Sequence, residues 1–239
     1  MDDLGASASV FAEIRGLVHG FGRRSGPATP ETREATAARL ESILAPRGRL
    51  LLLRQVHGAV VQEAPWSGRP AGDAAIASEP GFILGIETAD CLPVLLVDPH
   101  RRAVAAVHAG WRGTVARVTR AAVDALVHAG SRPEDLVAAL GPSIGPCCYE
   151  VGEDVSAAFG PAAAGFFRRA PGGRDHLDVR GANRQQLVEA GLDPSRIGSL
   201  DECTFCRSDL YYSYRRDGPG RGRMISFVGL AAALPPTRA

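Results

Sequence analysis

Two apolar segments separated by a short polar stretch decide the fold class: PVLLVDPHRRAVAAV, residues 93–107. Residues 93–97 and 103–107 are predicted to be strands, and because they show no polar alternation, both of their faces are expected to be buried. The period then changes, and residues 114–129 place apolar side chains on one helical face: Val115, Val118, Ala122 and Leu126. Gly130 stands at the C-terminal cap position of this helix. Buried strands followed by an amphipathic helix indicate an α/β protein.

The same alternation extends in both directions from this segment. We expect a helix at residues 31–44, introduced by Thr29 and Pro30 and ended by Pro46, and another at residues 183–190. Further strands are expected at residues 50–53, 59–61, 82–86, 136–140 and 224–228. No internal repeat, linker or change in composition divides the chain, which predicts one α/β domain over residues 1–239.

The composition excludes several classes of mechanism. The chain has 239 residues, a formal net charge of +1 and no lysine. Without lysine there is no Schiff-base lysine, no P-loop lysine and no lysine general base, so any phosphate is held by arginine, backbone N–H groups or a metal. The low net charge gives no field that favours nucleic acid or an anionic membrane surface.

Other features of the sequence bear on location. No apolar run approaches the roughly 20 residues that a membrane span needs, and residues 1–10 lack the pattern of a signal peptide. The five cysteines are an odd number, in a chain large enough to fold without disulfides. We therefore expect a cytoplasmic protein that binds neither a membrane nor nucleic acid. The oligomeric state is not specified by these features.

Polar residues occur at the ends of the predicted strands, where open α/β sheets place their sites. Cys91 precedes the strand at 93–97, His108 follows the strand at 103–107, and His57 lies in a polar break between two other strands. Two imidazoles and one thiolate suit zinc and leave a position open for water or substrate, which is the catalytic pattern. Spacing alone, however, favours a simpler interpretation, in which His57 is a loop histidine and Cys91 a small buried residue.

A loop that contains two glycines joins His108 to the helix that follows: Gly110, Trp111, Arg112, Gly113 and Thr114. Such a loop at a helix start presents free N–H groups and the positive end of the helix dipole to an anion, and Arg112 adds a guanidinium group. We therefore predict that Gly110, Arg112, Gly113 and Thr114 bind phosphate. The alternative is an ordinary tight connection in which Thr114 is the helix N-cap.

Cys203 and Cys206 form a lone Cys-x-x-Cys motif, which is half of a zinc site or a redox pair. No second pair has the same spacing, and the adjacent Cys147 and Cys148 are the only cysteines left to complement it besides Cys91. We therefore expect Cys206 to be incidental, and the sequence assigns no role to Cys147 or Cys148.

Five segments follow one another along the chain: QVHG at 55–58, TADCLPVLL at 88–96, HAGWRGT at 108–114, GPSIGPCCYEV at 141–151 and SYRRD at 213–217. Together and in this order they resemble the YfiH-like, or laccase-domain, purine nucleoside phosphorylases, and the resemblance spans residues 18–227. It implies a single compact domain with a mixed, largely buried sheet covered by helices, similar to the fold of bacterial toxin deamidases that use a Cys–His pair. Residues 1–17 would then be a variable N-terminal extension.

The resemblance implies that His57, Cys91 and His108 bind zinc, which overrides the simpler interpretation. The family is described as cleaving adenosine, inosine, guanosine and methylthioadenosine with phosphate, giving the base and ribose 1-phosphate, and as deaminating adenosine. Other descriptions attached to it are copper polyphenol oxidase, or laccase, and the editing of peptidoglycan precursors. We expect a zinc-dependent purine nucleoside phosphorylase with adenosine deaminase activity, with copper as the less favoured metal.

Further site residues are candidates by neighbourhood. Asp90, beside Cys91, is a candidate for protonating the departing purine, a step for which no other group is evident. Gln55, Arg215 and Arg24 are candidate substrate or phosphate ligands. Near Arg24 the chain departs from the family, because HGFGRR at 19–24 is similar to the N-terminal motif but the segment that usually follows is deleted.

Three other functions remain open. A copper oxidase agrees with two histidines and one cysteine as ligands, but a multicopper laccase needs many more than the six histidines of this chain. A thiol hydrolase would use Cys91 as the nucleophile and His108 as the base. A non-catalytic protein would bind a nucleotide or a cell-wall precursor and keep the zinc as a structural ion.

Overall fold

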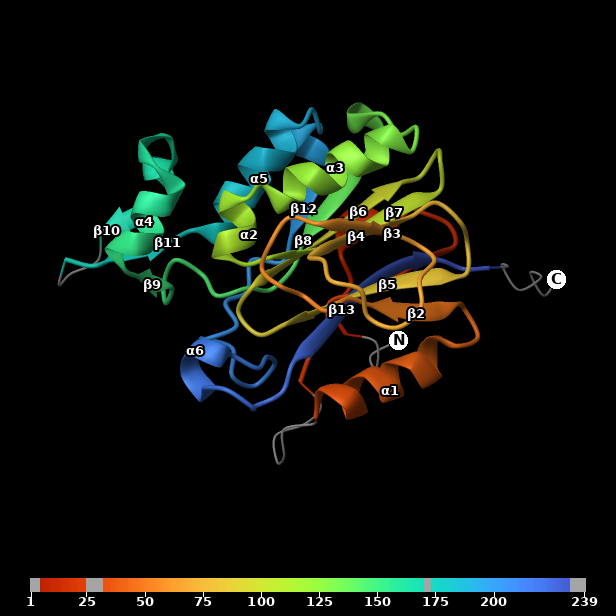
Figure 1. Cartoon of the computed structure of the whole chain (residues 1–239), viewed down its shortest axis with the longest axis horizontal. Coiled ribbons are helices and arrows are strands. Elements are labelled where there is room, and N and C mark those ends of the chain that lie inside the picture. The colour runs from red at the N-terminus through yellow and green to blue at the C-terminus, as the bar shows by residue number, and fades with distance from the viewer. Residues whose placement is uncertain (1–4, 25–31, 170–172, 233–239) are drawn as a thin grey trace.

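The computed structural model describes residues 5–24, 32–169 and 173–232, and its elements form stacked layers (Figure 1). Helices α3 (Val118–His128) and α5 (Val179–Glu189) cover a six-stranded sheet. A four-stranded sheet lies against the other face, and α1 (Arg33–Leu44) covers the outer side of that second sheet. The expected mixed α/β class is confirmed.

The six-stranded sheet contains the two strands that decide the fold class. Its order is β12 (Ile197–Ser199), β8 (Val137–Leu140), β6 (Leu92–Asp98), β7 (Ala103–Ala109), β4 (Ala74–Ala77) and β3 (Val61–Glu63). The central β6 and β7 form an antiparallel hairpin, whereas the outer pairs, β12 with β8 and β3 with β4, are parallel. All residues of β6 and β7 are buried, as their lack of polar alternation predicts.

The four-stranded sheet joins segments from both ends of the chain. Its order is β1 (Leu17–Gly20), β13 (Met224–Leu230), β5 (Phe82–Thr88) and β2 (Arg49–Leu52). β13 pairs antiparallel with β1 and β5, and β2 pairs parallel with β5. Because β5 ends at Thr88, this sheet delivers the chain directly to Asp90 and Cys91.

Three apolar clusters separate the layers. Between the helices and the six-stranded sheet lie Val94, Leu96, Val107, Ala122 and Leu126, among others. Between the two sheets lie Leu84, Ile86, Leu95, Val97, Ala106 and Val228, and beneath the second sheet lie Leu40, Leu44, Ile83 and Phe227. A single sheet covered by helices was expected, whereas a second sheet covers one face of the six-stranded sheet. An apolar strand has the same pattern whether a helix or a sheet covers it, which is why the sequence did not reveal this.

The helix expected at residues 114–129 is two helices. α2 (Trp111–Val115) is followed by α3, and Arg117 between them has a left-handed backbone with φ +60°. The N-cap residue of α2 is Gly110, and Thr114 is buried inside the helix. The interpretation of Thr114 as an N-cap is therefore wrong. The apolar period continues across Arg117, so the sequence pattern does not show the break.

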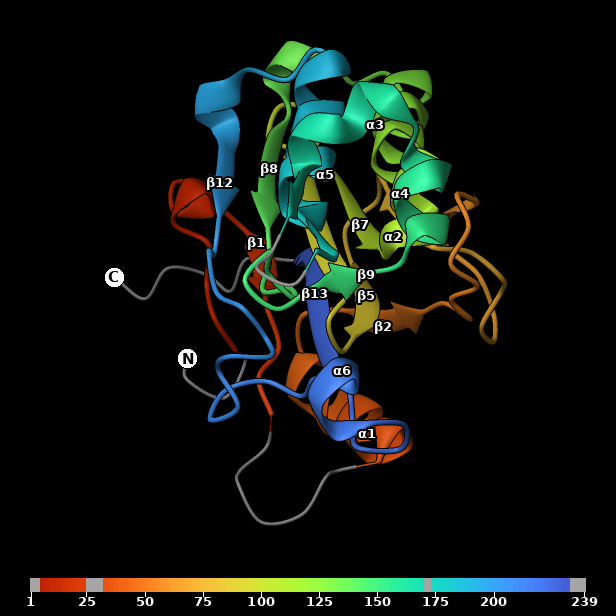
Figure 2. The same ribbon diagram turned by 90° about the vertical axis from the view of Figure 1, so that its left-hand side faces the viewer.

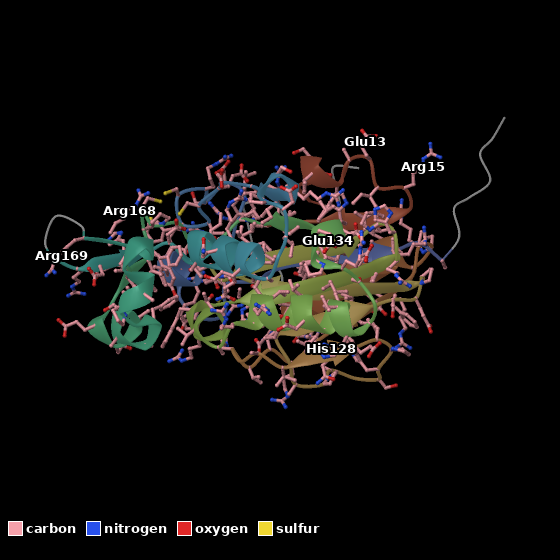
Figure 3. The ribbon with its side chains drawn as sticks, turned by 90° about the horizontal axis from the view of Figure 1, so that it is seen from above. Glu13, Arg15, His128, Glu134, Arg168 and Arg169 are labelled. Atoms are coloured by element: carbon pink, nitrogen blue, oxygen red, sulfur yellow. The ribbon has the colours of Figure 1, made fainter. Side chains whose placement is uncertain are left out.

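A third, small sheet lies at one end of the molecule, next to α4 (Glu153–Phe159), in the order β10 (Phe167–Arg169), β11 (Asp175–Leu177) and β9 (Glu150–Val151) (Figure 1). This end faces the viewer in Figure 2. Arg168 and Arg169 mark this end, which is distant from Glu13 and Arg15 (Figure 3). The remaining elements are α6 (Tyr214–Asp217) and 3₁₀ turns at Ser9–Phe11, Pro133–Asp135, Pro161–Phe166 and Pro194–Arg196. Within the described ranges, no helix combines the length and apolar character that crossing a bilayer requires.

Most of the expected elements occur close to their expected places. The strands expected at 50–53, 82–86, 93–97, 103–107, 136–140 and 224–228 are β2, β5, β6, β7, β8 and β13, and the one expected at 59–61 is shifted to β3. The helix expected at 183–190 begins earlier, at Val179, because the Asp178 side chain accepts a hydrogen bond from the Gly181 N–H. Thr32 is the N-cap of α1, whereas the start expected at Thr29 and Pro30 lies outside the described residues. The elements that were not expected from the sequence are short and lack a clear period: β1, β4, β9 to β12, α4 and α6.

The packing of the two sheets predicts a large effect of shortening Leu95, which is completely buried between them. Leu95→Ala is expected to lower the free energy of unfolding by about 2–5 kcal/mol, because the rigid sheets cannot close the cavity that remains. Urea denaturation followed by circular dichroism measures this. The control Val127→Ala, at an exposed position of α3, is expected to change stability by less than about 0.5 kcal/mol. Equal effects of the two substitutions would contradict the packing of the sheets.

Candidate active site

The hairpin of β6 and β7 brings Cys91 and His108 together. Cys91 immediately precedes β6, and Pro93 of β6 is paired in register with His108 near the end of β7. In an antiparallel hairpin the start of one strand lies beside the end of the other. His57 reaches the same place on the segment between β2 and β3. Residues that are distant in sequence therefore converge at one end of the central hairpin.

His57, Cys91 and His108 form a cluster in which one imidazole nitrogen of each histidine and the Sγ atom lie within 4.8 Å of one another. The two imidazole rings are nearly perpendicular, with centroids 4.8 Å apart. Gly110 makes room for the cluster, because a Cβ at this position would lie 3.0 Å from the Cys91 Sγ and 3.2 Å from the His57 Cδ2. The three residues predicted to be metal ligands are thus near neighbours in space.

A buried carboxylate that the sequence analysis missed organises the cluster. Asp73, just before β4, is completely buried, and its Oδ1 accepts a hydrogen bond from the His108 Nδ1 at 2.8 Å. It also accepts hydrogen bonds from the backbone N–H groups of Val56 at 3.2 Å, His57 at 2.9 Å and Gly58 at 2.7 Å. This arrangement leaves the Nε2 of His108 available to a metal, and a carboxylate partner of this kind is common for metal-binding histidines.

The backbone of His57 has a left-handed conformation with φ +60°. This conformation costs a non-glycine residue roughly 1–2 kcal/mol. The hydrogen bonds from residues 56–58 to Asp73 offset that cost and hold the loop in place. One side chain therefore orients His108 through its ring and His57 through its backbone.

Charges within the cluster shift the protonation of Cys91 and His108. Burial alone would raise the pKa of the Cys91 thiol, but His108 and His57 outweigh burial and lower this pKa to about 6. Burial alone would lower the pKa of His108, but the Cys91 thiolate and the Asp73 carboxylate raise it to about 9. Without a metal, the cluster therefore holds a thiolate–imidazolium pair near neutral pH. Since metal ligands must be deprotonated, a metal would displace the proton from His108.

A cavity of about 530 Å³ opens beside the cluster, a volume typical of small-molecule sites. Its wall includes the three cluster residues together with arginines, aromatic residues and acids: Arg33, Arg112, Arg215, Arg223, Trp111, Tyr149, Tyr214, Glu87 and Asp90. Aromatic faces suit a planar base, and guanidinium groups suit an anion. The wall therefore offers both kinds of contact next to the candidate metal ligands.

Arg112 is the arginine of this wall that is most available to an anion. Its guanidinium carbon lies 4.3 Å from the centroid of the Trp111 ring, a cation–π contact that holds the side chain. Among the described residues, no hydrogen bond or ion pair engages this guanidinium group. By contrast, Arg33 pairs with Glu87 at 2.6 Å, and Arg215 donates to the Glu150 carbonyl oxygen at 2.8 Å.

The other predicted phosphate ligands of this loop have packing roles. Gly110, Gly113 and Thr114 are not among the residues that line the cavity. The Thr114 hydroxyl donates to the Gly110 carbonyl oxygen and accepts a hydrogen bond from the Asn183 side chain, both at 2.9 Å. A Cβ at Gly113 would lie 3.1 Å from the Gly58 carbonyl oxygen. Of the predicted set in this loop, Arg112 is therefore the member that lines the cavity.

Asp90 lines the cavity, but both oxygens of its carboxylate already accept hydrogen bonds from the protein. Oδ1 accepts one from the Thr204 hydroxyl at 2.6 Å, and Oδ2 accepts two, from the Ser213 hydroxyl at 3.0 Å and the Arg215 N–H at 2.7 Å. These contacts favour a role in positioning the segment around residues 204–215 over the predicted role in protonating a purine.

The three remaining predicted ligands differ in their placement. Gln55 lines the cavity, but its side-chain amide both donates to and accepts from the backbone of Glu87, each at 2.8 Å. The Arg215 guanidinium lies over the Tyr149 ring, 5.5 Å from its centroid, and lines the cavity. Arg24 donates to the Ser208 carbonyl oxygen at 2.6 Å and is not part of the lining. Arg215 therefore remains a candidate substrate ligand, and the position of Arg24 does not support that role.

Tyr149 is a residue of the wall that was not singled out from the sequence. Burial and the nearby charge of Cys91 raise the pKa of its hydroxyl above the ordinary value. The hydroxyl is therefore protonated at neutral pH and can donate a hydrogen bond into the cavity. Its place next to Cys148, within the segment 141–151 that supports the resemblance, was the available signal.

The four other cysteines form a cluster of their own. The Sγ atoms of Cys147, Cys148, Cys203 and Cys206 all lie within 4.8 Å of one another. The expectation that Cys206 is incidental assumed that no pair complements Cys203 and Cys206, and that premise is wrong. Cys147 and Cys206 are 59 positions apart, so their proximity depends on the tertiary fold and cannot be inferred from spacing.

Comparisons with known proteins bear on the family of this chain. Residues 20–231 match the model of a family described as multi-copper polyphenol oxidoreductase laccase. A purine nucleoside phosphorylase of Deinococcus radiodurans is 45% identical over 74% of this chain and 69% of its own length. An adenosine deaminase from an unknown prokaryotic organism is 39% identical over 66% of this chain and 61% of its own length. The crystal structure of YlmD from Geobacillus stearothermophilus superposes with a TM-score of 0.82 at 30% identity, covering 91% of this chain and 93% of that chain.

The chain belongs to the laccase-domain family, which includes the YfiH and YlmD proteins. Its curated relatives carry the names of enzymes: several are purine nucleoside phosphorylases, and one is an adenosine deaminase. The resemblance inferred from the five sequence segments is confirmed.

The contacts of Asp73 predict that it controls metal affinity. Asp73→Asn is expected to weaken metal binding by the His57–Cys91–His108 cluster about 10- to 100-fold, because the amide does not reproduce the charged acceptor of the His108 ring. Competition with a chromophoric chelator measures this affinity. Asp98→Asn is the matched control, because this buried carboxylate also accepts backbone N–H bonds but lies at the other end of the hairpin. An unchanged affinity in Asp73→Asn would contradict the role of Asp73.

Proposed function

We propose that this chain is a zinc-dependent purine nucleoside phosphorylase that also deaminates adenosine. The observation that carries the proposal is the position of the His57–Cys91–His108 cluster in the wall of a cavity that Arg112 also lines. A metal next to an available guanidinium group suits a reaction between a nucleoside and phosphate. The curated relatives support an enzyme of this kind. The proposed nucleosides are adenosine, inosine, guanosine and methylthioadenosine.

The donor set of the cluster fits zinc. Zinc prefers imidazole and thiolate ligands, and three protein ligands leave a coordination position open, as in catalytic sites. The hydrogen bond from His108 to Asp73 fixes the ring in the orientation that a ligand needs. A bound zinc ion would supply Lewis-acid chemistry and lower the pKa of a coordinated water. Copper also accepts two histidines and one cysteine, and metal analysis distinguishes the two ions.

In phosphorolysis, a phosphate oxygen forms a bond to the ribose carbon that carries the base, and the bond to the base nitrogen breaks. Arg112 would orient phosphate through its paired N–H donors, with Trp111 holding the guanidinium group in position. The departing purine carries away the electron pair and needs a proton or a hydrogen bond. Tyr149 lines the cavity and is our candidate for this hydrogen bond, because its raised pKa suits a donor that keeps its proton.

Deamination of adenosine needs water at the purine carbon that bears the amino group, and it does not use phosphate. The two reactions would therefore share the metal cluster but differ in their need for Arg112. This difference makes Arg112 the residue that separates phosphate use from a general role in the site.

A second candidate function is a thiol hydrolase. Cys91, His108 and Asp73 provide a nucleophile, a base and a group that orients the base, and the lowered pKa of Cys91 favours the thiolate. A tightly bound zinc ion would make Cys91 a ligand and exclude this role. A multicopper oxidase is less well supported, because only two of the six histidines, all of them in the described ranges, belong to a candidate metal cluster.

The metal assignment predicts the effect of Cys91→Ala. This substitution is expected to remove about one zinc ion per chain and most of the turnover of adenosine, because two histidines alone hold zinc weakly. Elemental analysis and assays of adenosine with and without phosphate provide the measurements, and circular dichroism tests whether the domain remains folded. If Cys91→Ala keeps both the zinc and the activity, the ligand assignment is wrong. If wild-type protein binds adenosine without turning it over, the enzymatic proposal is wrong.

The availability of Arg112 predicts a selective effect of Arg112→Ala. Phosphorolysis is expected to lose on the order of 2–4 kcal/mol of transition-state stabilisation, and deamination is expected to lose less, because water replaces phosphate. The ratio of the two kcat/KM values measures this. Arg120→Ala, which removes a surface ion pair of α3, serves as the control. Equal losses of both activities in Arg112→Ala would indicate a structural role instead, and Arg215→Ala would then be tested in the same pair of assays.

A further inference from the structure

Two loops from distant parts of the chain meet at the cysteines outside the His57–Cys91–His108 cluster. Cys147 and Cys148 lie between β8 and β9, and Cys203 and Cys206 lie between β12 and α6. All four are free thiols. The proposed function uses none of them, although the motif Cys203-x-x-Cys206 is typical of metal sites.

The distances between the sulfur atoms suit a single tetrahedral ion. Zn–S bonds of about 2.3 Å place the sulfur atoms of a tetrahedral site about 3.8 Å apart. The Cys206 Sγ lies 3.8 Å from the Cys147 Sγ and 3.4 Å from the Cys148 Sγ. Both distances exceed the roughly 2.05 Å of a disulfide bond. An iron–sulfur cluster would hold its thiolates farther apart, because several iron atoms lie between them.

The backbone holds the two loops in this arrangement. The Gly145 N–H donates to the Cys203 Sγ at 3.3 Å, and the Cys148 N–H donates to the Gly145 carbonyl oxygen at 2.9 Å. Ser143 and Cys203 form an isolated parallel bridge between the loops. Hydrogen bonds to ligand atoms, such as the one to Cys203, orient them in metal sites. The four sulfur atoms therefore converge because the folded backbone directs them there.

Arginine side chains support the loop of Cys203 and Cys206. The Arg216 guanidinium donates to the carbonyl oxygens of Thr204 at 2.9 Å and Phe205 at 2.8 Å, and Arg180 donates to that of Glu202 at 3.0 Å. Arg216 also pairs with Asp217 at 2.8 Å and Arg180 with Asp201 at 3.4 Å, so the contribution of these arginines is to fix the position of the loop.

We propose that Cys147, Cys148, Cys203 and Cys206 bind one zinc ion through four thiolates, at a structural site separate from the catalytic cluster. Four protein ligands fill the tetrahedral shell and leave no position for substrate, which is the structural pattern. The ion would join two loops that support the cavity, since Tyr149 follows Cys148 and the Thr204 hydroxyl donates to Asp90 at 2.6 Å. The four-cysteine site would thus stabilise the part of the cavity wall that lies beside Cys91.

Metal analysis of the intact chain, purified with zinc and a reducing agent, tests the proposal. Wild type is expected to hold about two zinc ions per chain, and Cys91→Ala and Cys206→Ser about one each. The control Ser208→Ala changes an exposed hydroxyl in the same segment and is expected to hold about two. Cys91→Ala protein that retains no zinc would overturn the proposal, whether or not the chain proves to be a phosphorylase.

A second measurement does not depend on the folding of Cys206→Ser. Cobalt titrated into metal-free Cys91→Ala protein is expected to saturate at about one ion per chain, with the thiolate-to-metal charge-transfer absorption of a tetrahedral four-thiolate site. Bound zinc is expected to slow the reaction of a thiol reagent with the thiols of the four proposed ligands, Cys147, Cys148, Cys203 and Cys206. The proposal would be contradicted if this absorption is absent or if the rate of thiol modification is the same with and without zinc. It would also be contradicted if the four cysteines form two disulfides in protein kept under reducing conditions.

Discussion

The candidate site depends on the hydrogen bonds that the carboxylate of Asp73 accepts. This carboxylate is completely buried, and it accepts hydrogen bonds from three successive backbone N–H groups and from the His108 ring. Burial would raise the pKa of Asp73, but the bonds from His108, Gly58 and His57 outweigh burial and lower it. A buried charge with four donors is stable, whereas one that lost them would be costly. The positions of both cluster histidines therefore follow from a single side chain.

Asp90 has the corresponding role on the cavity wall. Its three accepted hydrogen bonds connect the end of β5 with the segment that carries Thr204, Ser213 and Arg215. Cys91 is the next residue, so the contacts that anchor Asp90 in the cavity wall also fix the backbone that carries the Cys91 thiolate. The cavity is thus assembled from segments that are far apart in sequence but share two buried carboxylates.

The parts of this architecture that could be predicted from sequence are those with a local signal. The strands at 93–97 and 103–107 are apolar without alternation, and the structure buries them completely. The pairing of β1 with β13, and the packing of one sheet on another, depend on contacts between distant segments and leave no local pattern. His57, Cys91 and His108 were identified through the resemblance, because spacing alone favoured a simpler interpretation. Asp73 stands before a short alanine-rich strand, and its role is visible only when that strand is paired with β7.

The hairpin of β6 and β7 has two ends with different constraints. The His57–Cys91–His108 cluster lies near the end where Leu92 is paired with Ala109, and the chain reverses at the other end, between Asp98 and Ala103. Seven-residue strands at about 3.3 Å per residue separate these ends by roughly 20 Å. Asp98 closes the turn by accepting the N–H groups of His100 and Arg101. The paired strands themselves keep the register that aligns Cys91 with His108. The turn can therefore become longer or shorter in evolution without moving these two residues. For the same reason, a peptide or a fluorophore can be inserted at the turn.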